Sequence, residues 1–181
     1  TCSTLSRSFS PVAALAPGMC GGGFMLDPDG RAMDDVFVMR LPSEDAGHDA
    51  FILRTQPVNH QRVKAWLRGL GDGYTLFDRS DLLAKVEGPL IVEDLTDPDH
   101  PDSCVALALH GPQAARYLAM LTDLSGAQAF TSANHVELVV PSSQAQAIYD
   151  HLVAAGATPG GPETVAALRA ASNLPVYTLS T

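Results

Sequence analysis

The alternation of apolar and polar residues is clearest between residues 24 and 41. Two apolar runs flank the turn sequence DPDG, and Asp and Gly are residues that reverse a chain between strands. The second run is almost continuously apolar after its first residues, which indicates a buried strand. The pattern predicts a hairpin of strands 23–27 and 34–41. Asp34 and Asp35 stand at the start of its second strand.

Helical spacing appears next in residues 57–70, where apolar residues recur every three or four positions before Gly71. Three further helices are expected at 111–121, 142–155 and 162–171. Further strands are expected at 51–55, 74–77, 90–92, 104–109, 127–130, 136–140 and 176–179. Residues 1–22 are expected to be irregular apart from a short helical turn.

Some of these segments carry more detailed expectations. The continuous apolar run CVALAL at 104–109 predicts a strand buried on both faces. The helix at 142–155 is expected to be capped by Ser142 and ended by Gly156. Residues 81–86 fit either a short strand or a helical turn.

Groups of strands alternate with helices along the chain, and many neighbouring strands are close enough to form hairpins. This order predicts an α+β fold with ferredoxin-like βαβ units, in which helices cover one face of antiparallel or mixed sheets. The acidic loop at 94–102 is the one plausible internal boundary. We therefore expect two subdomains, residues 1–96 and residues 97–181.

Composition narrows the class of partner. The net charge of −9 argues against nucleic acid and against anionic membrane surfaces, because both require basic patches. No apolar run approaches the roughly 20 residues of a membrane span. Three widely spaced cysteines do not suggest a disulfide framework, so a reducing, cytoplasmic location is expected.

The adjacent acids Asp34 and Asp35 are the most unusual candidates for chemistry. Acids at the start of a buried strand are costly unless they have partners. They fit either a functional pair or a structural pair that holds backbone amides near a turn. The six histidines show no ligand spacing, and DPDG lacks the frame of a calcium loop, so no metal is expected.

Four stretches occur in the order and nearly the spacing of a known family. They are SPVAALAPG (10–18), MLDPDGRAMDDVFVMRL (25–41), VALALHGPQAARYL (105–118) and LVAAGATPGG with LRAASNLPVY (152–177). Together they resemble the aminomethyltransferase family, the T-protein of the glycine cleavage system. Its folate-binding relatives include demethylases and iron–sulfur assembly factors. Relative to that family the chain lacks a first segment and a C-terminal barrel, so a fragment or a reduced relative is expected.

The resemblance implies roles for two acids. Asp34 matches the first Asp of the family's DD pair, which lies beside the folate and the nitrogen that receives the one-carbon unit. There a carboxylate favours a developing iminium-type cation or moves a proton. Glu137, in ANHVELVVP (133–141), matches an acid that binds the pterin. The alternative for Glu137 is an outward-facing residue in an alternating strand. The implied ligands are tetrahydrofolate and a small amine substrate.

Other positions depart from the family pattern. Gly22 lies where the family usually has Tyr, and Val165 lies where it has an Arg that serves the folate's carboxylated tail. Arg169 matches a second Arg, for which a structural role is expected. His110 lies where the family often has Gln, and it is also expected to be structural. The loop before Glu137 is also shorter than in the family. Loss of an aromatic ring and a guanidinium predicts weak or altered folate binding.

The sequence therefore predicts a tetrahydrofolate-binding, aminomethyltransferase-like domain and leaves open whether it is an active enzyme. One alternative is a non-catalytic protein of the same fold, of the iron–sulfur assembly type. Another is a scaffold subunit that depends on a partner protein. A carrier or partner protein is compatible with all three.

Overall fold

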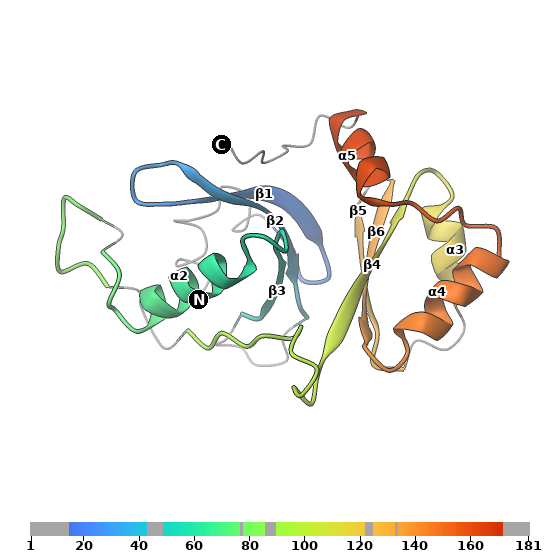
Figure 1. Ribbon diagram of the computed structural model, residues 1–181, viewed down its shortest axis with the longest axis horizontal. Helices are drawn as coiled ribbons and strands as arrows, with labels where there is room; N and C mark the ends of the chain where they lie inside the picture. The colour runs from blue at the N-terminus through green and yellow to red at the C-terminus, as the bar shows by residue number, and fades with distance from the viewer. Residues whose placement is uncertain are drawn as a thin grey trace. The chain divides into compact units, whose positions relative to one another are not determined.

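The computed structural model describes residues 15–42, 49–76, 78–85, 90–121, 125–132 and 134–171. These residues divide into two compact units (Figure 1). Unit 1 contains residues 15–17 and the described part of 21–93, whereas unit 2 contains residues 18–20 and the described part of 94–171. The division into subdomains of residues 1–96 and 97–181 stays a prediction.

Unit 1 is built on a three-stranded sheet in the order β1-β2-β3. Its strands are β1 (Cys20–Leu26), β2 (Ala32–Arg40) and β3 (Phe51–Arg54). The predicted hairpin is confirmed, with a turn in which the Asp27 carboxylate accepts hydrogen bonds from the backbone N–H groups of Asp29 and Arg31, at 2.9 and 2.8 Å. Asp in the first turn position thus closes the reversal that DPDG predicted.

The helix of unit 1, α2 (His60–Gly71), covers the sheet through its apolar face. Val63 and Leu67 pack in one cluster with residues of β1 and β2. The helix begins three residues later than residue 57. Asn59 precedes it and makes no side-chain cap hydrogen bond, and its Nδ2 donates a hydrogen bond to Asp34 Oδ1. This hydrogen bond joins the residue before α2 to strand β2.

The turn between β1 and β2 depends on the backbone freedom of Gly30, whose φ is +77°. Gly30→Ala is expected to lower the free energy of unfolding by about 1–2 kcal/mol, because an L side chain strains this left-handed conformation. No atom lies within 4 Å of the added Cβ, so a steric clash would not confuse the result. Urea denaturation followed by circular dichroism measures the change.

Gly22→Ala in β1 is the matched control. Its φ lies outside the left-handed range, and the added Cβ would meet the Phe37 ring at an ordinary 3.8 Å. A change within about 0.5 kcal/mol is expected there. Equal losses for both variants would show that the conformation at Gly30 does not set the stability of the hairpin.

Unit 2 is built on a second antiparallel sheet, in the order β4-β6-β5. Its elements, in chain order, are β4 (Cys104–His110), α3 (Ala114–Met120), β5 (Gln128–Ser132), β6 (His135–Pro141), α4 (Ala145–Ala154) and α5 (Pro162–Ala171). Two antiparallel sheets with helices confirm the α+β prediction. The arrangement is compatible with ferredoxin-like units.

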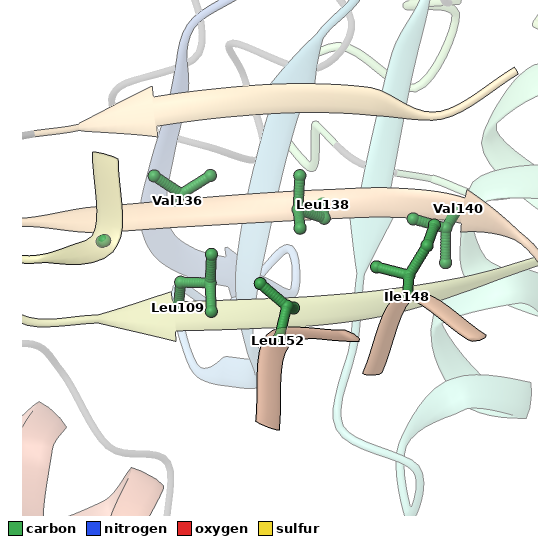
Figure 2. Packing of buried hydrophobic residues seen from close by; sticks show 7 residues of the cluster. Leu109, Val136, Leu138, Val140, Ile148 and Leu152 are labelled. Carbon is green, nitrogen blue, oxygen red and sulfur yellow. The ribbon is translucent and has the colours of Figure 1, made fainter. Parts of the chain in front are cut away.

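Helices α3 and α4 lie on the same face of this sheet (Figure 1). Figure 2 shows Leu109 of β4, Leu138 of β6 and Leu152 of α4 gathered in one core cluster. Because side chains alternate along a strand, His135 and Glu137 of β6 project from the opposite face. The helix-covered core thus fixes which residues the other face presents.

Several sequence-based predictions for unit 1 are wrong. Residues 74–76 and 90–92 are not strands. The backbone N–H groups of Tyr74 and Thr75 instead donate to Gly69 O at the end of α2, at 3.0 and 3.1 Å. A short apolar run forms a strand only beside a partner strand, and these runs have none in the sheet order. Residues 81–85 form a turn, in which Ala84 N–H donates to Asp81 O.

Two predictions for unit 2 are also wrong. Strand β4 is buried on one face only, since Leu109 is buried whereas Ala106 and Ala108 are exposed. Ser142 does not cap α4, because its hydroxyl is hydrogen-bonded to that of Ser103, at 2.8 Å, and the helix begins at Ala145. Gly156 does end it, with a φ of +101°. The predicted strand at 176–179 lies outside the described residues, as does most of 1–22.

Candidate functional site

Asp34 lies on the face of β2 that packs against α2, together with Val36 and Val38. Its Oδ2 accepts a hydrogen bond from the Gln56 backbone N–H at 3.0 Å, and its Oδ1 accepts one from Asn59 Nδ2 at 2.8 Å. The side chain has no exposed surface. Two donors from the segment before α2 therefore hold both oxygens of a buried carboxylate in place.

Burial raises the pKa of the Asp34 carboxyl above its ordinary value of 3.8. Hydrogen bonds from Asn59 and Gln56 lower this pKa, but burial, reinforced by the nearby charge of Asp35, outweighs them. A buried carboxyl whose pKa is shifted upward is a recurrent feature of groups that exchange protons in a reaction. The environment of Asp34 therefore suits either electrostatic stabilisation or proton transfer.

Asp35 is also buried, at 2% exposure, but it points to the opposite face of β2. Phe37 shares that face and lies beneath the guanidinium of Arg54, 5.2 Å from the Cζ atom to the ring centroid. The pleat of the strand thus separates the two acids. Asp34 does hold a backbone amide, as the structural alternative predicts, and this contact also orients its carboxylate.

Glu137 lies in unit 2, whereas Asp34 lies in unit 1. The Glu137 side chain is only 1% exposed, and its Oε2 lies 2.9 Å from His135 Nε2. Its cross-strand neighbours are Ala108 on β4 and Phe130 on β5. Deep burial with a histidine partner does not fit the alternative of an outward-facing, solvated strand residue.

The structure brings a third polar group to Glu137. His110 of β4 pairs with His135 of β6 in the sheet register, and their Nδ1 atoms are 3.1 Å apart. From the sequence, His110 is expected to be structural, and His135 carries no signal of a role. Their 25-residue separation carries no ligand-spacing signal, because only the pairing of β4 with β6 makes them neighbours.

The positions that depart from the family pattern are placed as follows. Gly22 lies in β1 next to the Phe37 ring, so an aromatic side chain lies near the site of the missing Tyr. Val165 lies on α5 and is partly exposed. The Arg169 backbone belongs to α5, but its side chain lies outside the described part of the structure.

We next consider whether the described residues include a metal-binding cluster or a reactive cysteine. Among the described residues, no group of three or more His, Cys, Asp or Glu side chains is arranged to hold a metal ion. Burial raises the pKa of the Cys104 thiol, which keeps it in the weakly nucleophilic protonated form. Among the described residues, the buried carboxylates Asp34, Asp35 and Glu137 and the histidines beside Glu137 are therefore the principal polar groups.

Comparison with known proteins supplies the family. The model of the GCVT N-terminal domain matches residues 5–179. The chain belongs to this family. The resemblance stated from the four sequence stretches is thereby confirmed, and the buried acid pair of β2 lies in the GCVT N-terminal domain.

Members of the GCVT family named aminomethyltransferase are similar over most of this chain. The protein from Herpetosiphon aurantiacus is 31% identical over 173 residues, covering 92% of this chain and 45% of that protein. The protein from Exiguobacterium sibiricum is 29% identical over 181 residues, covering 96% of this chain and 46% of that protein. The chain therefore spans about half the length of these relatives.

The described helices of this GCVT domain include none with the length and apolar character needed to cross a lipid bilayer.

Proposed function

We propose that this GCVT domain binds tetrahydrofolate and takes part in transferring a one-carbon unit from a small aminomethyl donor. Asp34 lies beside the reacting nitrogen in this proposal, and Glu137 binds the pterin. The buried and doubly held carboxylate of Asp34 is the observation that carries it. The names of the similar proteins support the same chemistry.

Asp34 is suited to a reaction in which positive charge develops on an amine. Each of its oxygens accepts one hydrogen bond within unit 1, and a carboxylate oxygen is able to accept a second. A fixed negative charge shielded from water stabilises an iminium-type cation more strongly than a solvated one does. Because Asp34 is fully buried, a ligand that contacts it must displace part of what covers it.

Glu137 is suited to recognising a ring edge with two adjacent N–H donors. A carboxylate accepts two such donors side by side, as the pterin of folate presents them. His135 holds one oxygen of this carboxylate at 2.9 Å. The Glu137 carboxylate is thereby oriented before a ligand arrives, which lowers the entropy cost of binding.

The departures at Gly22 and Val165 predict weak binding of the folate. Loss of the guanidinium at residue 165 removes a charge-assisted contact to the carboxylated tail. The aminomethyl donor, a carrier or partner protein and the complete reaction are proposals, since the chain spans about half of its relatives. The assembly-type and scaffold alternatives gain no support from relatives named aminomethyltransferase.

Titration calorimetry with tetrahydrofolate under anaerobic conditions tests the proposal. The unmodified chain is expected to bind it, and Glu137→Gln is expected to weaken binding about tenfold or more, because a charged acceptor is lost. Glu163→Gln, at the exposed start of α5, is the matched control and should leave the affinity unchanged. If millimolar tetrahydrofolate produces no binding heat with the unmodified chain, the proposal is wrong.

A further inference from the structure

Three ionisable side chains form a continuous line on the face of unit 2 that α3 and α4 leave uncovered. His110 Nδ1 lies 3.1 Å from His135 Nδ1, and His135 Nε2 lies 2.9 Å from Glu137 Oε2. The two rings are 4.3 Å apart between centroids and inclined by 49°. His135 is 13% exposed and Glu137 1%, so the line runs from a partly accessible ring to a buried carboxylate.

The contacts restrict where the protons lie. An ionised carboxylate only accepts hydrogen bonds, so His135 must carry its proton on Nε2 to bond Glu137. A neutral His135 then has a lone pair on Nδ1, and His110 must donate from its own Nδ1. For an ionised Glu137 and two neutral rings, one arrangement satisfies both contacts, with Nδ1–H on His110 and Nε2–H on His135.

We propose that His110 and His135 form a proton relay that orients the Glu137 carboxylate and connects it to Nε2 of His110. A proton bound at His110 Nε2 allows the Nδ1 proton of His110 to pass to His135 Nδ1. The Nε2 proton of His135 then passes to Glu137 Oε2. One proton enters, one O–H bond forms, and each ring ends neutral in the opposite tautomer.

The relay also affects ligand binding. This consequence rests on the proposed function, in which Glu137 binds the pterin. The ionised carboxylate accepts from two adjacent N–H donors, whereas the protonated carboxyl has a donor of its own on one oxygen. Proton delivery through the histidines therefore favours release of a ligand with paired donors. His110 and His135 act through Glu137 and are positioning residues.

Within unit 2, the Glu137 carboxylate directly contacts one ionisable side chain of its own strand, His135. Its cross-strand neighbours on this face, Ala108 and Phe130, carry no charge. Arg116, Asp150 and His151 are exposed and belong to α3 and α4, which pack on the opposite face.

Long-range ¹H–¹⁵N correlation spectra of the labelled chain at neutral pH test the relay without any substitution. His110 is expected as the Nδ1–H tautomer, which is the less common one in free histidine, and His135 as the Nε2–H tautomer. His110→Phe and His135→Phe assign the signals. Rapidly averaged tautomers at both rings, or Nε2–H at His110, would overturn the proposal even if no variant folds.

A substitution series then separates a positioning role from a merely structural one. His110→Phe is expected to mix the tautomers of His135 and to weaken tetrahydrofolate binding about fivefold, because one oriented hydrogen bond is lost. His110→Gln retains an N–H donor toward His135 and is expected to restore both properties. His151→Phe on α4 is the control and should change neither. An unchanged affinity for His110→Phe would refute the role in ligand binding.

The two proposals fail in different ways. If the tautomers are as expected but the unmodified chain binds no tetrahydrofolate, the relay stands and the proposed function is wrong. If tetrahydrofolate binds but the tautomers differ, the relay is wrong and the proposed function stands.

Discussion

Asp34→Asn is expected to bind tetrahydrofolate within about threefold of the unmodified chain while its one-carbon transfer slows about 100-fold or more. The amide has nearly the shape of the carboxylate but carries no negative charge to stabilise a cation and does not take up a proton. Calorimetry measures the affinity, and single-turnover formation of the one-carbon folate product measures the transfer.

Asp35→Asn is the matched control for this prediction. It removes the same charge one residue away, but from the opposite face of β2. Transfer is expected to stay within about threefold, and the pair of variants therefore separates position from net charge. Equal losses for both variants would show that Asp34 has no special role.

Stability must be followed in parallel. The amide of an Asn at residue 34 would place an NH₂ group near the donors of Asn59 and Gln56, which costs about 1–3 kcal/mol when one donor is left unsatisfied. A chain that retains its circular dichroism spectrum and folate affinity excludes unfolding as the cause of lost transfer.

Leu138→Ala is expected to lower the free energy of unfolding of unit 2 by about 3 kcal/mol. Leu138 has no exposed surface and lies on the central strand β6, beneath α3 and α4 (Figure 2). Removal of its branched end loses transfer free energy and leaves a cavity that a packed sheet fills poorly. Urea unfolding monitored by circular dichroism measures the loss.

Val153→Ala on α4 provides the comparison. Val153 is 38% exposed, and Ala has the higher helix propensity, so a change within about 0.5 kcal/mol is expected. A loss below about 1 kcal/mol for Leu138→Ala would mean that the core beneath the helices is not tightly packed.

The sequence predicts well those parts of the fold that depend on residues close together in the chain, such as turns and helix ends. The β1–β2 hairpin follows from DPDG, and the end of α4 follows from Gly156 at a positive φ. The segments 74–77 and 90–92 were expected as strands because they are short and apolar. A strand forms only where its backbone is hydrogen-bonded to a neighbouring strand, and composition alone does not reveal which segment is that neighbour.

The candidate site also combines residues that the sequence predicted with contacts that only the structure shows. The resemblance to the aminomethyltransferase family selected Asp34 and Glu137, and their side chains prove to be buried. Their partners came only from the structure. Asn59 lies 25 residues from Asp34 and His135 meets His110 across two strands, so neither contact leaves a spacing pattern in the sequence.

The sequence by itself therefore determined the α+β class, the hairpin, all four described helices to within three residues at each end, and the family. These depend on periodicity, turn residues and ordered motifs, which are properties of neighbouring positions. Only the tertiary structure decided which face of β2 Asp34 occupies, what holds its carboxylate, and that two histidines reach Glu137. Those facts arise from strand register and from packing between distant segments, where one residue of slip would turn each side chain to the other face.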